Sequence, residues 1–406
     1  SLMKPLSFKA QLNLLKRCIS RDLNLEKELK AHGLTYDNLQ YGKNVIQDNL
    51  FADNSAFAEY KSLNQYRADN HGIPAVSFFS GCGGMDLGFE YAGFQNIAAI
   101  ELNEIFCKTI LHNRPDNFVV GPPAYSGDAR NREEIIEALR TKLGLTLKSF
   151  EGVFHGGPPC QPFSIAANQR FSKNGDNFKR NGFQNTEYGN LLFDYVFYIK
   201  TLRPAVFLIE NVAGLLTVGG GDQLSEAIAQ LHKAGYVVTK PAVINAADYG
   251  VPQNRLRAFI IGYKKSSKKY IFPSPSGVKV PCGAALTLPL NGANNHITRN
   301  HKAESIIRYM ELDYGERDHL GRVDRLDPRL PAKTVIAGGS NGGGRSHLHP
   351  QIPRTLSVRE SARLQTFPDD YEFVGAPARQ FTQVGNAVPP LLTYHLARSI
   401  FESFFH

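Results

Sequence analysis

A cysteine flanked by prolines is the residue of this chain best suited to nucleophilic chemistry. Cys160 stands in the segment 156–164, GGPPCQPFS, directly after the apolar run 152–154. Prolines fix the backbone, and the carboxyl ends of buried strands in an α/β sheet are where such folds bind ligands. A thiolate becomes a strong nucleophile when nearby donors or positive charge lower its pKa. The alternative, a small buried hydrophobic side chain, is disfavoured by this rigid polar setting.

Charged groups accompany two further apolar runs. Glu210 ends the run 205–209, and a carboxyl close to apolar walls can hold or share a proton near neutral pH. Arg255 and Arg257 stand at alternate positions just before the run 258–261. Period two predicts both guanidiniums on one side of a strand, suited to gripping a carbonyl oxygen or a phosphate, although a solvated pair is the usual interpretation of Arg-x-Arg alone.

A glycine-rich turn follows the first apolar strand, with an acidic residue after the second. Glycines in Phe79–Gly84 (FSGCGG) let the backbone turn sharply, and Glu101 can accept both hydroxyls of a ribose. Asp86 occupies the place where a dinucleotide fingerprint has its third glycine, so a nucleoside cofactor other than a nicotinamide fits better. A glycine turn without a ligand is the alternative.

The elements that position these groups alternate between strands and helices. Apolar runs at 75–79, 97–100, 152–154, 205–209 and 258–261 recur between helical stretches, which predicts a parallel sheet covered on both faces. Residues 4–70 predict short amphipathic helices, with Leu12, Leu15, Ile19 and Leu23 on one stripe. Residues 264–353 are rich in glycine, proline and asparagine, and a capping box at Ser357 and Glu360 predicts a helix that ends before Pro368.

Composition narrows the class of protein. The chain has 406 residues, 42% of them hydrophobic, which is enough for two or three domains. Its formal charge of +9 favours a polyanionic partner. Five scattered cysteines without a Cys-x-x-Cys spacing argue against a disulfide framework and against a zinc site. We expect no bound metal, no membrane span and a cytoplasmic location.

Six sequence blocks together resemble one enzyme family. They are Phe79–Gly84, Pro158–Ser164, Glu210–Val212, Gln253–Arg257, Arg354–Pro368 and Val384–Pro390. Their order is typical of DNA (cytosine-5) methyltransferases, which the chain resembles over about residues 73–263 and 354–406. The resemblance implies a Rossmann-like α/β methyltransferase domain with a mostly parallel sheet, a smaller loop-rich target-recognition domain and an N-terminal helical extension. The expected boundaries are 1–72 for the extension, 73–263 for the catalytic domain, 264–380 for target recognition and 381–406 for a segment that returns to the catalytic domain.

The resemblance also assigns the site residues. S-adenosylmethionine is the implied cofactor, and the residues implied to bind it are Phe79, Gly81, Gly83, Glu101, Leu102, Asp128, Pro159 and Asn386. Cys160 matches the family nucleophile, Glu210 the contact to the cytosine ring nitrogen and Arg257 the group near the ring carbonyl, with Arg255 supporting that pocket. The implied reaction is methylation at C5 of a flipped-out cytosine in a specific double-stranded DNA sequence, through a covalent adduct between Cys160 and C6.

Two regions are expected to contact DNA. The segment 165–188 matches the family's mobile loop but is longer than usual, and it mixes aromatic residues with Arg170, Lys173, Lys179 and Arg180. The glycine-rich segment 338–347 carries Arg345, which is suited to guanine, and a solvated glycine loop is its alternative. Tyr188-Gly189 replaces the family's usual Arg-Gly, which affects the closing geometry of the loop and not the nucleophile.

Three other functions are compatible with part of the pattern. A tRNA-methylating branch shares the chemistry but shows a Cys-Phe-Thr element, whereas Cys282 here is followed by Gly283-Ala284. Residues 4–70 could form a helix-turn-helix-like module that binds the protein's own promoter, although their interspersed charges favour an extension packed over the catalytic domain. An inactive paralogue is disfavoured because Cys160, Glu210 and Arg257 are all present. We expect a monomer of prokaryotic type that acts alone or with a restriction endonuclease of the same site; the sequence does not reveal the target.

Overall fold

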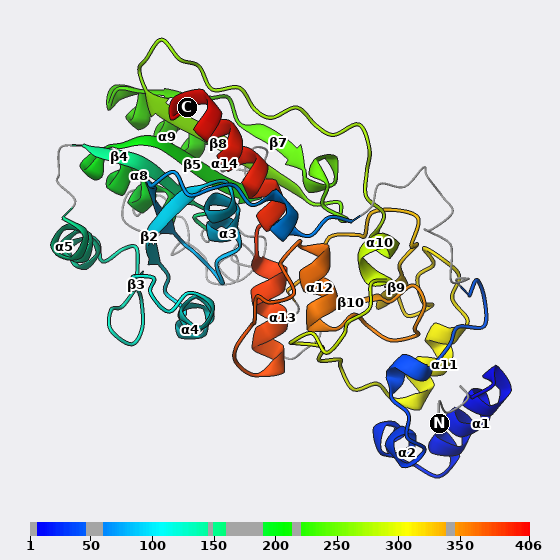
Figure 1. Ribbon diagram of the computed structural model, residues 1–406. Coiled ribbons are helices and arrows are strands. Elements are labelled where there is room, and N and C mark those ends of the chain that lie inside the picture. The colour runs from blue at the N-terminus through cyan, green and yellow to red at the C-terminus, as the bar shows by residue number, and fades with distance from the viewer. Residues whose placement is uncertain (1–5, 46–59, 145–148, 160–189, 213–220, 338–345) are drawn as a thin grey trace, which may run out of the picture. The chain divides into compact units, whose positions relative to one another are not determined.

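The computed structural model describes residues 6–45, 60–144, 149–159, 190–212, 221–337 and 346–406. The chain forms two compact units, each assembled from three stretches (Figure 1). We call residues 62–249, 256–275 and 387–406 the sheet unit. Residues 1–61, 250–255 and 276–386 are called the loop-rich unit. The N-terminal residues and the region expected to recognise the target therefore belong to the same unit.

The sheet unit is built on one eight-stranded sheet of order β3-β2-β1-β4-β5-β8-β6, with β7 paired to β8. The first five strands run parallel, and β8 pairs antiparallel with β5, β6 and β7. The strands are β1 (Ile73–Phe78), β2 (Phe94–Ile100), β3 (Val119–Val120), β4 (Phe150–Gly156), β5 (Pro204–Val212), β6 (Tyr236–Val238), β7 (Ala242–Asn245) and β8 (Leu256–Lys264). The α/β fold with a mostly parallel sheet is thereby confirmed, while the expectation that the run 258–261 is a parallel strand is wrong.

Strand order reverses between β1 and β4, which are neighbours in the sheet. In open α/β sheets, ligands bind outside the carboxyl ends of the strands at such a switch point. The FSGCGG turn leaves β1 at this point, and the backbone that leads to Cys160 leaves β4 beside it. The topology therefore brings together two of the sequence blocks singled out above.

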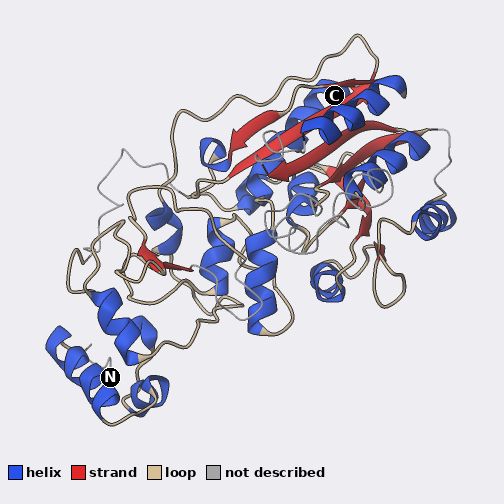
Figure 2. Ribbon diagram, turned by 180° about the vertical axis from the view of Figure 1, so that it is seen from behind, coloured by secondary structure: helices blue, strands red, loops and turns tan. Residues whose placement is uncertain are grey.

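Helices cover both faces of the sheet, as Figure 2 shows. They are α3 (Gly84–Tyr91), α4 (Glu104–Asn113), α5 (Arg132–Leu143), α8 (Leu191–Leu202), α9 (Gly221–Lys233) and α14 (Pro390–Phe404), with short 3₁₀ turns η2 (Leu63–Tyr66) and η5 (Ala246–Tyr249). Side chains alternate along β1: Phe78 joins an apolar cluster with α5, α8 and α9, whereas Ser77 points to α3 on the opposite face.

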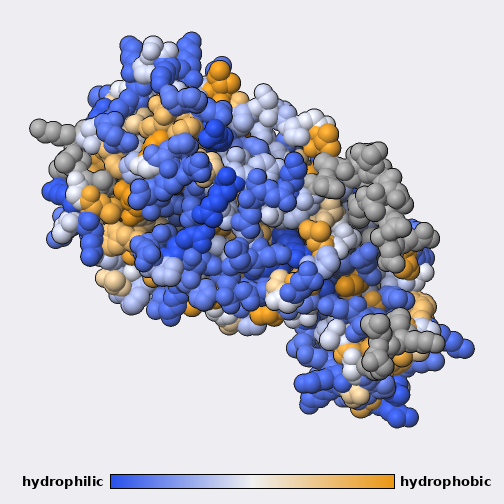
Figure 3. Space-filling view, in the orientation of Figure 1, coloured by the Kyte–Doolittle hydropathy of each residue, from blue (hydrophilic) through white to orange (hydrophobic). Residues whose placement is uncertain are grey.

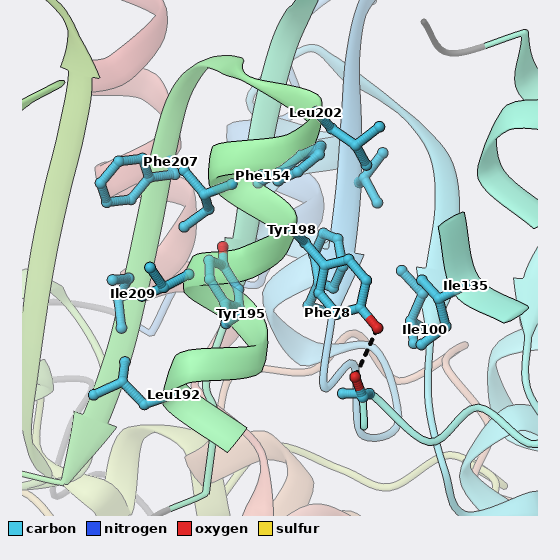
Figure 4. Packing of buried hydrophobic residues seen from close by; sticks show 14 of the residues in the cluster. Phe78, Ile100, Ile135, Phe154, Leu192, Tyr195, Tyr198, Leu202, Phe207 and Ile209 are labelled. Carbon is cyan, nitrogen blue, oxygen red and sulfur yellow. Dashed lines mark hydrogen bonds between the residues drawn. The ribbon is translucent and has the colours of Figure 1, made fainter. Parts of the chain in front are cut away.

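Aromatic and aliphatic side chains pack together in that cluster (Figure 4). Phe78 lies between Tyr195 and Tyr198, with ring centroids 5.2 and 5.3 Å away, and all three side chains are buried. The Tyr198 hydroxyl donates to the carbonyl of Ala129 at 2.6 Å, drawn as a dashed line. Burial of rings whose hydroxyls are satisfied fixes α8 against β1 and orders the loop before α5.

On the other face, α3 and α14 approach closely. A Cβ at Gly88 would lie 2.0 Å from the Thr393 hydroxyl oxygen, so glycine is required there. Leu391, Leu392, Leu396 and Ile400 are buried, as expected for a final helix that opens at Pro389-Pro390. The last residues of the chain therefore form part of the sheet unit.

The loop-rich unit contains short elements around a core of its own. They are α1 (Phe8–Ser20), α2 (Leu25–Ala31), η1 (Tyr36–Asn38), α10 (Cys282–Leu286), α11 (Ala303–Met310), β9 (Val323–Arg325), β10 (Ser346–Leu348), α12 (Val358–Leu364) and α13 (Pro377–Asn386), with β9 and β10 paired in parallel. The capping box of α12 forms as expected, because the Ser357 hydroxyl accepts from the Glu360 amide and the Glu360 carboxylate accepts from the Ser357 amide.

The N-terminal helices pack differently from the expectation. The buried stripe of α1 is Gln11, Leu14, Leu15 and Cys18, whereas Ile19 and Leu23 are exposed. This stripe joins an apolar cluster with Ile306 and Met310 of α11, in the loop-rich unit. The apolar stripe of α1 therefore packs within the loop-rich unit, and the interpretation of residues 4–70 as a cover for the catalytic domain stays a prediction.

Hydrophilic residues cover most of the face seen in Figure 3, with hydrophobic residues between them in small groups. In the part of the chain that is described, no helix is long and apolar enough to cross a membrane.

Candidate active site

The turn after β1 is built from left-handed backbone. Gly81 has φ +57° and Gly83, the N-cap of α3, has φ +97°, both in the region that favours glycine. Phe79 also has a positive φ of +54°, which costs energy for a residue with a side chain and is typical of functional turns. A Cβ built on Gly81 would meet nothing within 4 Å. The backbone conformation, and not crowding, therefore requires glycine at 81.

Glu101 ends β2 and faces this turn. Its Oε1 accepts from the Gly81 amide at 2.7 Å and its Oε2 from the Asn103 amide at 2.6 Å. The side chain is only 8% exposed, and burial raises its pKa even though these bonds favour the carboxylate. Each carboxylate oxygen has a second lone pair. The backbone of Leu102 also bonds the carboxylate, so three backbone groups hold it in place beside the turn, where a ribose-binding carboxylate is expected.

Leu102 and Asp128 flank Glu101. Leu102 is 58% exposed, unusual for a leucine beside a buried carboxylate, so its apolar surface is free to pack on a flat ring. A Cβ at Gly127, whose φ is +67°, would lie 2.0 Å from the Glu101 carbonyl oxygen. Glycine at 127 therefore allows the loop that carries Asp128 to lie against Glu101. A bidentate ion pair with Arg130 lowers the pKa of Asp128 and keeps it an acceptor.

The carboxylate of Glu210 lies against the backbone that leads to Cys160. Glu210 is on β5 and 8% exposed, and a Cβ at Gly157 would lie 2.3 Å from its Oε2. The next residue, Asn211, donates from Nδ2 to the Pro158 carbonyl at 2.9 Å. Two consecutive residues of β5 thus hold the Gly-Pro-Pro stretch. The carboxylate of Glu210 occupies the space that a side chain at Gly157 would need, and Asn211 donates a hydrogen bond to Pro158.

Arg257 lies beside Glu210, with Nε 3.6 Å from Oε1. In the register of β5 and β8, Glu210 is opposite Phe259, so Arg257 is the diagonal neighbour on the same face. Burial lowers the pKa of the guanidinium and Glu210 opposes that shift. A carboxylate and a guanidinium are therefore presented together at the end of β5.

Arg255 has different surroundings. It lies before β8, so the period-two argument does not extend to it, and it belongs to the loop-rich unit. Its buried guanidinium donates to the Val335 carbonyl at 2.8 Å, the Gly385 carbonyl at 2.7 Å and the side chain of Gln253 at 3.1 Å. These bonds join three stretches of that unit, and a role in a cytosine pocket stays a prediction.

Comparisons with known proteins show the family of the chain. The model of the C-5 cytosine-specific DNA methylase family matches residues 73–402, most of the chain. The chain belongs to this family. It is accordingly a DNA (cytosine-5) methyltransferase, an enzyme that transfers a methyl group to C5 of cytosine in DNA, with S-adenosylmethionine as the donor that the family implies.

Several relatives extend the likeness beyond single motifs. The methyltransferase is 32% identical to the Type II methyltransferase M.NgoFVII of Neisseria gonorrhoeae over 370 residues, which cover 85% of this chain and 90% of the relative. It is also 32% identical over 355 residues to M1.HphI of Haemophilus parahaemolyticus, covering 84% and 90%. A solved DNA modification methyltransferase encoded within a prophage of E. coli superposes with a TM-score of 0.65 at 24% identity, covering 82% of this chain and all of the other. That likeness supports the methyltransferase fold.

Several assigned residues of the methyltransferase lie outside the described residues: Cys160, Arg170, Lys173, Lys179, Arg180 and Arg345. Pro159 is described and exposed. Asn386, the exposed last residue of α13, belongs to the loop-rich unit, and its part in the cofactor pocket stays a prediction. No group of three or more His, Cys, Asp or Glu side chains in the described ranges is arranged to hold a metal ion.

Sequence reasoning missed a buried polar group beneath the cofactor turn. Asp86, in the first turn of α3, accepts from the Ser77 hydroxyl at 2.7 Å, and Ser77 and Ser80 share a hydrogen bond of 2.6 Å. Burial raises the pKa of Asp86 to about 7, although the Ser77 bond lowers it. The sequence did draw attention to Asp86, but only as the residue that breaks the dinucleotide fingerprint, and gave it no role of its own. Asn211 and Gly157 were likewise quoted within motifs without a role.

Proposed function

We propose that the enzyme methylates a flipped-out cytosine within one specific sequence of double-stranded DNA, through a covalent bond between Cys160 and C6. The observation that carries this proposal is the position of Glu210. Its carboxylate lies against Gly157 and beside Arg257, while Asn211 bonds Pro158, two residues before the thiol. A nucleophile with a carboxyl and a guanidinium nearby suits addition to a cytosine ring.

The residues have separate parts in the addition. The Cys160 thiolate forms a bond to C6, Glu210 supplies a proton to N3, and Arg257 stabilises charge on O2. Addition converts the ring into an enamine whose C5 is nucleophilic. C5 would take the methyl group from the sulfonium of the bound donor, whose bond between sulfur and methyl breaks and leaves a thioether. A base would then remove the C5 proton, and its electrons would restore the C5–C6 double bond as the bond between the Cys160 sulfur and C6 breaks and releases the thiolate. A stacked base cannot reach these groups, so the cytosine leaves the helix, which costs a few kcal/mol.

The residues around Glu101 fit the adenosine part of S-adenosylmethionine. Glu101 accepts the ribose hydroxyls, Leu102 packs on the adenine and Asp128 accepts from its amino group. Three observations support this fit: the carboxylate of Glu101 is held by backbone groups at the turn, Leu102 is 58% exposed, and the turn at Phe79, Gly81 and Gly83 is left-handed. When bound, S-adenosylmethionine supplies an electrophilic methyl group. Pro159 and Asn386 complete the pocket in this proposal.

DNA and other partners are assigned by the same reasoning. Arg170, Lys173, Lys179, Arg180 and Arg345 contact DNA, Arg255 supports the cytosine pocket, and the enzyme acts as a monomer. Its relatives include enzymes named Type II methyltransferases, which supports a companion restriction endonuclease for the same site. Target recognition belongs to the loop-rich unit, because it contains residues 276–386 with their short elements and loops.

The decisive experiment follows labelled methyl groups into unmethylated DNA and, separately, into tRNA, with bisulfite sequencing of the DNA. We expect label in DNA alone, at one cytosine of a short fixed sequence. Cys160→Ser should abolish transfer and leave cofactor binding within about twofold of wild type, since the thiol attacks the base and does not hold the cofactor. Appreciable turnover by this variant would refute the covalent mechanism, and label in tRNA alone would refute the substrate.

A further inference from the structure

The family match begins at residue 73, so the first 72 residues of the chain lie outside it. We call residues 6–44 the N-terminal segment. Its helices bury apolar side chains against α11 of the loop-rich unit, 270 or more residues later in the chain. The buried residues of this cluster include Leu14, Leu15, Cys18, Leu25, Leu29, Ile306, Tyr309 and Met310. The N-terminal segment is therefore packed into the core of that unit.

A fully buried arginine depends on the N-terminal segment. Arg325 donates to the carbonyls of Lys43 at 2.7 Å and Asn44 at 2.8 Å, and also to Leu312 and Pro350. Its guanidinium carbon lies 3.6 Å from the ring centroid of Tyr41. A buried guanidinium needs acceptors for its five donors. The N-terminal segment supplies two of the four carbonyls and the closest aromatic face.

A second buried arginine joins the N-terminal segment to α12. Arg354 donates from Nε to Asp37 at 2.7 Å and from Nη1 to Glu360 at 2.6 Å. Although burial opposes ionisation, His296 and Arg354 hold the pKa of Asp37 well below its usual range. Glu360 is the capping-box residue of α12. Asp37 thus holds Arg354 in place, and Arg354 in turn bonds the carboxylate that caps the first turn of α12.

The end of α12 continues this line of contacts. The Gln365 side chain accepts from Gln253 at 2.7 Å, and Gln253 accepts from the Val335 amide at 2.8 Å. His347, on β10, is bonded to the Thr334 carbonyl at 3.0 Å. Hydrogen bonds therefore lead from Asp37, through α12, to the backbone of residues 334–335.

We propose that the N-terminal segment is an integral part of the target-recognition unit and that Asp37 is a positioning residue for DNA recognition, acting through Arg354 and Glu360. This inference rests on the proposed role of the loop-rich unit in reading DNA. It assigns residues 6–44 to substrate recognition and not to promoter binding. The expected consequence is selective: a change at Asp37 alters the interaction with DNA and leaves the cofactor site of the sheet unit unaffected.

The test measures steady-state methyl transfer by full-length Asp37→Asn, which keeps one acceptor oxygen and removes the charge. We expect the KM for DNA to rise about 10-fold, which is about 1.4 kcal/mol, with kcat and the KM for S-adenosylmethionine within twofold of wild type. Asp37→Glu should recover most of the loss. Glu26→Gln, which neutralises an exposed carboxylate of the same segment, is the matched control and should behave as wild type.

Other outcomes separate the explanations. A KM for DNA unchanged in Asp37→Asn would overturn the inference. Equal changes in both KM values would also overturn it, because the effect is then not selective for DNA, and so would a lower kcat alone, which indicates a loss of folded enzyme. If Asp37→Asn does not fold, Tyr41→Phe decides the question, because it removes only the hydroxyl bond to the His349 carbonyl of 2.5 Å. A DNA-selective rise in KM supports the inference and an unchanged KM overturns it. Wild-type enzyme that methylates no DNA would instead refute the proposed function.

Discussion

Gly157→Ala tests whether the position of the Glu210 carboxylate governs catalysis. The new Cβ would lie 2.3 Å from Oε2, about 1 Å closer than ordinary van der Waals contact, and 3.5 Å from both Cδ and the backbone oxygen of Glu210. Since only the carboxylate oxygen clashes, the side chain gives way and the strand does not. A displacement of about 1 Å in a reacting group costs about 10²-fold in rate, or roughly 2.7 kcal/mol of transition-state stabilisation. We therefore expect kcat to fall about 100-fold.

The assay is single-turnover methyl transfer at saturating DNA and cofactor, together with cofactor binding by calorimetry. The Kd for S-adenosylmethionine should stay within twofold of wild type, because the three atoms nearest a Cβ at Gly157 all belong to Glu210, which is not among the residues assigned to adenosine. Gly277→Ala is the matched control, since a Cβ there meets nothing within 4 Å. A single-turnover rate in Gly157→Ala within threefold of that control would refute the reasoning, and a lost melting transition would show that the strand had moved after all.

Two further substitutions address the cofactor turn. Glu101→Ala removes the carboxylate that bonds Gly81 and Asn103. Loss of charge-assisted hydrogen bonds worth about 1.5–3 kcal/mol should weaken S-adenosylmethionine binding by about 10- to 100-fold, while bisulfite sequencing still reports the wild-type target. Unchanged cofactor affinity would argue against the ribose role. Asp86→Asn should change the pH dependence of stability. Because burial raises the folded-state pKa to about 7, the native protein holds this proton more tightly than the unfolded chain, so stability is lost as pH rises from about 4 to about 7. Urea unfolding at pH 5 and pH 8 should show the variant gaining about 2.7 kcal/mol relative to wild type between the two, since the wild-type loss from pH 5 to about pH 7 spans about two pH units. An identical pH slope in both proteins would contradict this.

Much of the sheet unit could be predicted from the sequence because its strands are buried on both faces and read as continuous apolar runs. Those at 75–79, 97–100 and 205–209 coincide with β1, β2 and β5. Direction could not be predicted for 258–261, because periodicity is the same in parallel and antiparallel strands. The contact between Glu210 and Arg257 depends on the register of β5 with β8, which no local pattern encodes.

The N-terminal helices show a different limit. Charged residues surround the apolar positions of α1, and sequence spacing favoured Leu12, Leu15 and Ile19, whereas the buried stripe begins at Gln11. Gln11 can be buried because its side-chain amide is hydrogen-bonded to the backbone of Leu6, Asn38 and Gln40. A hydrophobicity pattern does not reveal such hydrogen bonds. The partner of the stripe, α11, lies far along the chain, so neither the packing nor the buried arginines could be anticipated.

The discontinuous loop-rich unit has a consequence for synthesis of the protein. The Tyr36 hydroxyl pairs with the backbone of His301, 265 residues later. At about 5–20 residues per second, the ribosome makes the second partner roughly 15–50 s after the first. During that interval Leu14, Leu15, Leu25 and Leu29 have no α11 to cover them, while the strands of the sheet unit emerge between the two partners. The nascent chain therefore completes the strands from β1 to β8 before its own beginning can pack against α11, and a pause in translation between the two partners prolongs exposure of this apolar surface.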